Sequence, residues 1–240
     1  MVDPVIAVTG LAKYYGGRAV IEGVTLTLAP GDMVGLVGAN GGGKTTTLRM
    51  LAGLIAPDTG TGSVLGEPIS RASAARRRRI GYMGQRLALY ADLTVAENLR
   101  FYADVHGLSA ARAVIAAATD RFGLAPVLTQ RFGTLSGGWA RRVQFAATML
   151  HAPPLLLLDE PTAGLDVVTR HDIWRWLDEL AAAGHAIVIS THDLAEAERC
   201  PTVLLYEAGR AAAQATPRAL AAAAGVATLE AAVRARATRT

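Results

Sequence analysis

The feature that most constrains the fold of this chain is a glycine-rich loop at residues 38–45, GANGGGKT. An apolar run of strand length, residues 33–37, precedes the loop, and a helical pattern at residues 46–54 follows it. Glycines allow consecutive backbone N–H groups to curl around an anion, and the next helix adds the positive end of its dipole. Alone, the short pattern is equally consistent with an ordinary glycine-rich turn. The order of strand, loop and helix favours a phosphate-binding P-loop, in which Lys44 reaches the outer phosphates and Thr45 binds Mg²⁺.

The composition is that of a globular protein with a large core. With 240 residues, 51% of them hydrophobic, the chain is long enough for one domain. Cys200 is the single cysteine, so no internal disulfide can form, and no cysteine or histidine cluster has the spacing of a metal site. The chain starts without signal-peptide features and has no apolar stretch near the roughly 20 residues that span a bilayer. We therefore expect a cytoplasmic protein.

Positive charge is concentrated in four consecutive arginines at residues 76–79. The net charge of +4 and the isoelectric point near 9.6 would suit nucleic acid or an anionic membrane surface as a partner. However, the run stands at an expected helix end, and no aromatic stacking pattern accompanies it. We interpret the arginines as a solvated face with dipole compensation, and we expect no nucleic-acid partner.

The apolar patterns predict an α/β fold. Short strands are expected at residues 5–9, 24–28 and 33–37, separated by glycine and proline turns, and they indicate an antiparallel layer beside a nucleotide-binding core. Residues 155–158 and 186–189 are continuous apolar runs that flank a helical pattern. Such runs are typical of central parallel strands that are covered on both faces.

Helical patterns occupy the middle and the end of the chain. Helical spacing dominates from about residue 94, and we expect a helical subdomain over approximately residues 86–152. Thr216 followed by Pro217 has the pattern of an N-cap with proline at the first helical position, which predicts a packed helical tail over approximately residues 211–240. The expected fold is a single domain, residues 1–240. It has a P-loop NTPase core with a mixed or parallel sheet, an antiparallel β layer near the N-terminus and the helical subdomain.

Two adjacent carboxylates, Asp159 and Glu160, stand at the carboxyl end of the apolar run 155–158. Open α/β sheets bind their ligands at this edge. The two side chains point in different directions, so one carboxylate can hold Mg²⁺ while the other orients and deprotonates an attacking water. The alternative is an acidic strand end that is exposed to solvent.

A second anion site is indicated by Ser136, Gly137 and Gly138, which precede a helical run at residues 139–150. Free N–H groups and the helix dipole would attract an anion there, but this segment has no lysine of its own. The P-loop provides one half-site with a lysine, Lys44, and this segment provides a second half-site without a lysine. We therefore expect a complete site to be assembled from both. The spacing does not show whether they meet within one chain or between two.

The order of these motifs resembles that of the ATP-binding subunits of ABC transporters, and the resemblance covers nearly the whole chain. That family carries a GxxxxGK[ST] loop, a glutamine loop, an LSGGQ signature, an apolar run ending in Asp-Glu, a following Asp and a late His. In this sequence the motifs are matched, in the same order, by residues 38–45, Gln85, residues 135–138, residues 155–160, Asp166 and His192.

The resemblance implies ATP and Mg²⁺ as ligands and assigns roles to the matched residues. Glu160 would act as the general base, assisted by Lys44, Gln85 and His192, of which His192 contacts the γ-phosphate. Mg²⁺ would be bound by Thr45, Gln85 and Asp159. The residues implied to bind ATP are Tyr15, Gly38, Asn40, Gly41, Gly43, Lys44, Thr45, Thr46, Ser136, Gly137, Gly138 and Asp166.

Three of the matched positions are ambiguous or differ from the family pattern. Tyr15 resembles the aromatic residue on which adenine stacks, but Tyr14 beside it leaves that assignment open by one residue. Gly84 stands where the family usually has proline, so the glutamine loop is expected to be more mobile. Trp139 stands where the signature normally has glutamine, and its indole packs either on its own domain or on a dimer partner. With the catalytic residues present, the site is expected to be competent for hydrolysis.

The resemblance also implies partners. Two such chains, expected to be identical, would pair head to tail with ATP between the P-loop of one and the signature of the other. A separate integral membrane permease would supply the transport path, with this chain on the cytoplasmic face of the membrane. Residues 82–108 resemble exporter ATPases that serve ABC-2-type permeases. The alternatives are an importer ATPase subunit, a soluble ABC-type ATPase of translation or DNA maintenance, and a regulatory ATP-binding module without turnover.

Overall fold

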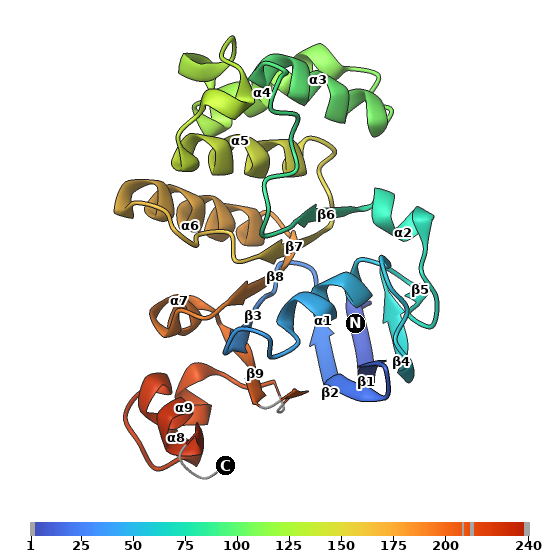
Figure 1. Ribbon diagram of the computed structural model, residues 1–240, viewed down its shortest axis with the longest axis vertical. Helices are drawn as coiled ribbons and strands as arrows, with labels where there is room; N and C mark the ends of the chain where they lie inside the picture. The colour runs from blue at the N-terminus through green and yellow to red at the C-terminus, as the bar shows by residue number, and fades with distance from the viewer. Residues whose placement is uncertain (1–2, 208, 212–213, 238–240) are drawn as a thin grey trace.

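The computed structural model describes residues 3–207, 209–211 and 214–237, and it has the expected α/β fold (Figure 1). Ten strands in this part of the chain form one mixed sheet in the order β5-β4-β1-β2-β10-β9-β3-β8-β7-β6. The strands are β1 (Ile6–Tyr15), β2 (Arg18–Leu28), β3 (Met33–Gly38), β4 (Thr59–Val64), β5 (Glu67–Pro68), β6 (Ile80–Met83), β7 (Leu155–Asp159), β8 (Ala186–Thr191), β9 (Thr202–Glu207) and β10 (Arg210–Ala211).

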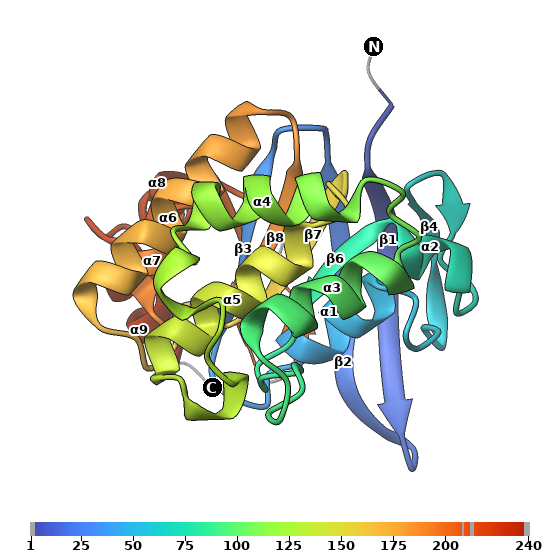
Figure 2. The ribbon, with the colours of Figure 1, turned by 90° about the horizontal axis from the view of Figure 1, so that it is seen from above.

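The helices cover both faces of this sheet and form a block at one end of the molecule (Figures 1 and 2). The α-helices are α1 (Lys44–Leu51), α2 (Ala74–Arg78), α3 (Val95–Val105), α4 (Ala111–Phe122), α5 (Gly137–Met149), α6 (Val167–Ala182), α7 (Leu194–Arg199), α8 (Pro217–Ala223) and α9 (Leu229–Ala237). Two short 3-10 helices, Ala125–Val127 and Phe132–Thr134, lie between α4 and α5. None of the helices in the described residues has the length and apolar character needed to cross a bilayer.

The parallel strands β9, β3, β8, β7 and β6 form the centre of the sheet. Successive residues of β7 point to opposite faces: Leu155 and Leu157 pack with α1, whereas Leu156 and Leu158 pack with the aromatic side chains of α5 and α6. All four leucines are fully buried. A strand that is covered on both faces is apolar at every position, and the predicted parallel core is therefore confirmed.

The helix after the P-loop starts and ends earlier than the pattern at residues 46–54 predicts. It begins at Lys44 and ends at Leu51, and Gly53 leaves the helical region with φ 71°. Leu54 is 44% exposed and does not join the buried face. The apolar spacing continued past the glycine, but the glycine terminates the helix.

The antiparallel layer is larger than predicted. Strands β1 and β2 form a long hairpin around Gly16 and Gly17, both with positive φ, and β4 pairs with the other edge of β1. Register shifts, one of them between Val8 and Leu11, interrupt the pairing of the hairpin strands. Because bulges break the two-residue alternation on which strand prediction depends, only fragments of these strands were visible in the sequence.

The interpretation of the four-arginine run as a solvated face is wrong for Arg76. Arg76 lies in α2 with its side chain fully buried, and its guanidinium donates to the carbonyl oxygens of Pro68 (3.1 Å) and Arg71 (3.0 Å). Arg77 donates to the carbonyl oxygen of Gly53 at 2.9 Å. Arg76 therefore joins α2 to β5 of the antiparallel layer, and Arg77 joins α2 to the end of α1. Four identical neighbours give no sequence signal of which one turns inwards.

Helices α3, α4 and α5 lie within the expected subdomain range of 86–152 and pack against one another (Figure 2). The α3 helix begins at a capping box, in which Thr94 and Glu97 satisfy each other's backbone N–H groups. At the opposite end of the molecule, α8 begins at the predicted N-cap Thr216, and α9 packs on α7. Residues 1, 2, 208, 212, 213 and 238–240 of the expected domain lie outside the described residues.

Two stacked histidines in the helical block predict a loss of stability in mild acid. The rings of His106 and His151 are parallel, with centroids 3.8 Å apart. Burial, reinforced by His106, lowers the pKa of His151 from 6.5 to about 4. Between these values the unfolded chain binds a proton that the folded chain does not, so stability falls as the pH drops from 6.5 towards 4. Wild-type protein should lose about 2 kcal/mol of unfolding free energy from this group between pH 7 and pH 5.

The variant His151→Phe keeps a flat ring but cannot be protonated. Urea denaturation at the two pH values should show a smaller loss in this variant than in the wild type. An equal loss in both proteins would contradict the prediction.

Candidate functional site

The loop between β3 and α1 has a backbone that favours glycine. Gly41 has φ 78° and Gly43 has φ 98°. A Cβ on Gly43 would lie 2.7 Å from the Cβ of Ile21 in β2, so the neighbouring strand also excludes a side chain at this position. Gly43 is the N-cap of α1, and no side-chain hydrogen bond caps it. The N–H groups of the first helical turn are therefore available to an anion.

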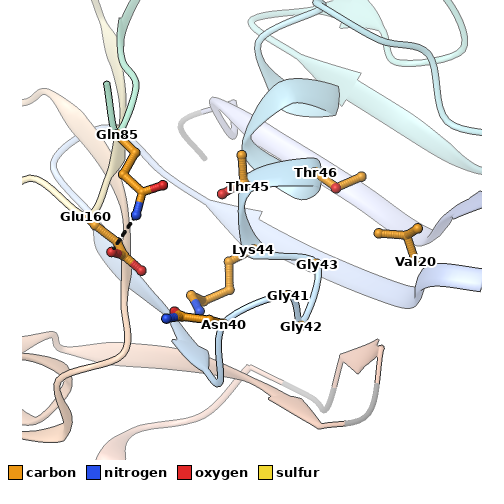
Figure 3. A pocket seen from close by; sticks show the side chains of 10 residues that line it. All are labelled: Val20, Asn40, Gly41, Gly42, Gly43, Lys44, Thr45, Thr46, Gln85 and Glu160. Atoms are coloured by element: carbon orange, nitrogen blue, oxygen red, sulfur yellow. Dashed lines mark hydrogen bonds between the residues drawn. The ribbon is translucent and has the colours of Figure 1, made fainter. Parts of the chain in front are cut away.

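A cavity of about 370 Å³ lies beside this loop (Figure 3). Its lining residues are Val20, Asn40, Gly41, Gly42, Gly43, Lys44, Thr45, Thr46, Gln85 and Glu160. The structure thus brings the glutamine loop and one of the two carboxylates to the P-loop, and the volume is in the range of small-ligand sites. Val20 was not among the candidates, because a lone valine in a strand carries no signal that it faces a cavity.

Lys44 is buried, and its ammonium lies across the P-loop. Its Nζ donates to the carbonyl oxygens of Gly38 (2.7 Å) and Ala39 (3.0 Å). Burial lowers the pKa of this lysine, and the Glu160 and Asp159 carboxylates oppose that shift. An ammonium has three N–H donors, so one remains for a phosphate oxygen after these two bonds.

Asp159 joins the P-loop to two neighbouring strand ends. Thr45 Oγ1 donates to its Oδ2 at 2.9 Å and lies 3.1 Å from its Oδ1. Ser190 Oγ at the end of β8 donates to Oδ1 at 2.6 Å and accepts from the backbone N–H of Glu160 at 3.0 Å. Ser190 was not predicted as a site residue, although it directly precedes Thr191 and His192 in the late-histidine motif. Its role follows from the pairing of β7 with β8, which a lone serine does not reveal.

Glu160 is held by two of the predicted catalytic side chains. Gln85 Nε2 donates to one carboxylate oxygen at 3.0 Å (Figure 3), and His192 Nδ1 lies 3.1 Å from the other. The Glu160 backbone is left-handed, with φ 49°, which L side chains rarely adopt. This turn aims Glu160 at the cavity, while Asp159 faces Thr45. The sequence expectation of two carboxylates pointing in different directions is confirmed.

The segment Ser136 to Gly138 lies apart from the P-loop cavity, whose lining does not include it. Ser136 is the N-cap of α5 and accepts from the Trp139 N–H at 3.5 Å, and both Ser136 and Gly137 are exposed. The two anion half-sites therefore do not share one cavity within this chain. An exposed helix N-terminus remains available to an anion from outside.

Asp166 is the N-cap of α6. Its carboxylate accepts from the N–H groups of Val168 (3.0 Å) and Thr169 (2.9 Å) and from the Thr169 hydroxyl (2.7 Å). These hydrogen bonds hold the pKa of Asp166 below its usual range, and those from Thr169 have the largest effect. Within one chain this residue therefore caps a helix and does not line the P-loop cavity.

Trp139 packs on its own domain. The guanidinium of Arg142 lies over the indole, 5.0 Å from its centroid, and also over Trp176 at 5.2 Å. Arg142 forms an ion pair with Asp172 of α6. The departure from the family signature is thus accommodated by a cation–π contact within α5, and the same arginine joins α5 to Trp176 and Asp172 of α6.

Tyr15 lies at the end of β1 with 54% of its surface exposed, outside the cavity lining. The hydroxyl of Tyr14 donates to Glu22 at 2.6 Å, whereas the ring of Tyr15 has the Lys13 ammonium over it, 5.7 Å from the ring centroid. The Tyr14 side chain is therefore held by a hydrogen bond from its hydroxyl, whereas Tyr15 presents an exposed ring.

The chain is similar to known proteins over most of its length. A family model described as "ABC transporter" matches residues 21–163. A second model, described as "AAA domain, putative AbiEii toxin, Type IV TA system", matches residues 133–198. The chain is 42% identical over 223 residues to the Nod factor export ATP-binding protein I of Paraburkholderia xenovorans (strain LB400), covering 92% of this chain and 73% of that protein.

Other relatives are consistent with this match. The chain is 36% identical over 217 residues to the probable multidrug ABC transporter ATP-binding protein YbhF of Escherichia coli (strain K12), covering 90% of this chain and 38% of that protein. Among solved structures, one titled "Structure of ATP binding subunit of ABC transporter" superposes with a TM-score of 0.87 at 32% identity, over 97% of this chain and 99% of that one. The cbiO1 protein of Clostridium perfringens, part of the ABC transporter complex cbiONQ, gives a TM-score of 0.80 at 27% identity, over 92% and 91% of the two chains.

The network around Asp159 makes a prediction for Ser190→Ala. The substitution leaves a buried carboxylate oxygen and the Glu160 N–H each without one partner, so the free energy of unfolding should fall by about 1–3 kcal/mol. Urea denaturation measures the change. Ser109→Ala at an exposed position is the control and should stay within about 0.5 kcal/mol of the wild type. A Ser190→Ala variant as stable as this control would contradict the role of the hydroxyl.

Proposed function

The chain belongs to the ABC transporter ATP-binding family, whose members are ATPases that drive transport, and on this basis we propose how its own residues bind and hydrolyse ATP. In our proposal the phosphates lie in the cavity of Figure 3 and Glu160 is the general base. One observation carries this assignment. The Glu160 carboxylate reaches the P-loop cavity while Gln85 and His192 each hold one of its oxygens.

The residues around the cavity fit a triphosphate with Mg²⁺. The amides of residues 41–46 and the Lys44 ammonium supply donors to phosphate oxygens. Mg²⁺ prefers oxygen ligands and is commonly bound by one or two protein groups together with substrate phosphates. The Thr45 hydroxyl, the Asp159 carboxylate and the Gln85 amide oxygen form such a set and would hold it. When bound, Mg²⁺ neutralises charge that develops on the phosphate oxygens.

The catalytic step follows from the placement of Glu160. Its carboxylate takes the proton of a water that attacks the γ-phosphate in line, while Lys44 and the loop amides stabilise the charge on the transferred group. His192 is 52% exposed at its side chain and can contact both Glu160 and an outer phosphate. Gln85 fixes the other carboxylate oxygen and thereby the direction from which the base acts.

Replacing the base tests this mechanism. Glu160→Gln keeps the shape of the side chain but cannot accept the proton, so turnover should fall by about 10² to 10⁴. Binding of ATP should be retained, because the phosphate donors are unchanged. Phosphate release by the purified protein measures turnover, and equilibrium binding of a fluorescent ATP analogue measures affinity.

Lys44→Ala is the matched comparison, since it should impair both binding and turnover. If Glu160→Gln hydrolysed ATP at the wild-type rate, Glu160 would not be the base. If Lys44→Ala bound ATP as tightly as the wild type, the phosphate assignment would be incorrect.

We further propose that two identical chains, each a single ATP-binding domain, pair head to tail around two ATP molecules. The support is that Ser136 and Gly137 are exposed at the start of α5 and lie outside the P-loop cavity of their own chain. A γ-phosphate held by one P-loop would then meet the α5 N-terminus of the other chain. Glu160→Gln with MgATP should therefore sediment as a dimer, whereas Lys44→Ala should remain a monomer.

We propose that the membrane partner is a separate ABC-2-type permease and that the transport direction is export. The support comes from the relatives named for Nod factor export and multidrug transport. The chain would then act on the cytoplasmic face of the membrane, where ATP is available.

A surface next to the glutamine loop fits this partner. Leu87, Tyr90, Phe101 and Val105 are between 40% and 61% exposed, and Tyr90 and Phe101 pack edge to face at 5.0 Å. A groove of about 290 Å³ is lined by Tyr90, Phe101 and Val105, and also by Tyr102. Exposed apolar side chains grouped in this way favour a protein partner. The surface follows Gln85 directly in the chain, so docking there would reach Glu160 through that glutamine.

Phe101→Glu places a charge in the centre of this surface and should abolish co-purification with an integral membrane protein from detergent-solubilised membranes. Basal ATP hydrolysis should stay within about twofold, because Phe101 is remote from the cavity lining. Leu54→Glu is the control, because Leu54 is 44% exposed and lies outside this surface. This variant should still co-purify with the membrane protein. Loss of the partner from both variants, or from neither, would count against this surface.

A further inference from the structure

Arg141 lies on α5 and is almost fully buried, with 5% of its surface exposed. Its side chain points at the turn that carries Glu160. Nε donates to the carbonyl oxygen of Pro161 at 3.1 Å, and Nη2 donates to that of Glu160 at 2.6 Å, with Asp159 O at 3.5 Å. One guanidinium therefore spans three consecutive carbonyl groups of the catalytic turn.

The other arm of the same guanidinium reaches the glutamine loop. Nη1 donates to the carbonyl oxygens of Gly84 (3.2 Å) and Gln85 (3.0 Å), and it lies 3.3 Å from Oε1 of Gln144. Gln144 in turn donates to the carbonyl oxygen of Arg86 at 3.1 Å. Three segments far apart in the sequence thus meet at one side chain: the start of α5, the glutamine loop and the end of β7.

The turn at Glu160 needs such support. Its left-handed backbone, φ 49°, persists only where the surroundings hold it. The Glu160 N–H is fixed by Ser190, and its carbonyl group is fixed by Arg141. Only arginine offers five donors in a planar fork, which matches carbonyl groups that approach from two sides; a lysine ammonium cannot span them.

We propose that Arg141 is a positioning residue that sets the Glu160 carboxylate relative to the glutamine loop and passes movements of α5 to it. The inference rests on the proposed function, in which Glu160 is the base and the α5 N-terminus meets the ATP of a partner chain. Closure of the pair displaces α5, and a permease displaces the glutamine loop. Both displacements act on the Glu160 backbone through the same guanidinium, so hydrolysis responds to both partners without either touching Glu160.

The test compares Arg141→Lys and Arg141→Met with the wild type and with Arg76→Lys. Arg76 is the matched control, because it is likewise a buried arginine whose guanidinium donates to backbone carbonyl groups, those of Pro68 and Arg71, but it lies away from the P-loop cavity. Turnover at saturating MgATP, the KM for ATP and the affinity for a fluorescent ATP analogue are measured for each. Amide hydrogen exchange is followed over residues 84–87.

We expect both Arg141 variants to lose at least tenfold in kcat, while KM and ATP affinity change by less than about twofold. Exchange over residues 84–87 should become faster. Arg76→Lys should keep wild-type kcat and exchange, even where its unfolding midpoint falls as far as that of the Arg141 variants. If Arg141→Met does not fold, Arg141→Lys decides the question, because it keeps the buried positive charge.

The proposal is overturned if kcat of a folded Arg141 variant stays within twofold of the wild type, or if Arg76→Lys loses kcat equally. A wild-type protein that binds MgATP but does not hydrolyse it with its partner present would instead contradict the proposed function. The two failures are thus distinguishable.

Discussion

The arrangement of the site depends on one buried carboxylate, that of Asp159. A carboxylate that is 3% exposed must have hydrogen-bond partners, since its desolvation would otherwise be costly. It finds them in Thr45 at the start of α1 and in Ser190 at the end of β8. Because β3, β8 and β7 are adjacent parallel strands, their carboxyl ends meet at one edge, and Asp159 locks them together there.

The position of Glu160 follows from these contacts of Asp159. The chain must turn sharply after Asp159 to bring the next carboxylate to the cavity, and it does so through a left-handed residue. Its N–H, its carbonyl group and both carboxylate oxygens are each held by a different residue: Ser190, Arg141, Gln85 and His192. A side chain held at four points keeps its direction only while the segments that hold it keep their positions. In our proposal, this geometry connects ATP hydrolysis to the two partners of the chain.

Much of this could be predicted from the sequence, because the P-loop, the apolar strands and the paired carboxylates are local patterns. The contacts that complete the site are not local. Ser190 and Arg141 act through strand pairing and helix packing, and nothing in their neighbours marks them. Arg76 was assigned to solvent because a run of like charges usually is solvated, yet the space beside Gly53 admits one guanidinium.

The central claim is that a nucleoside triphosphate and its metal lie between the P-loop and the two carboxylates. The most direct measurement is anomalous diffraction from crystals of the wild-type protein grown with Mn²⁺ and a non-hydrolysable ATP analogue. We expect one manganese peak beside the Thr45 hydroxyl and the Asp159 carboxylate, with the phosphates against the amides of residues 41–46. Manganese bound elsewhere, or phosphates outside this loop, would contradict it.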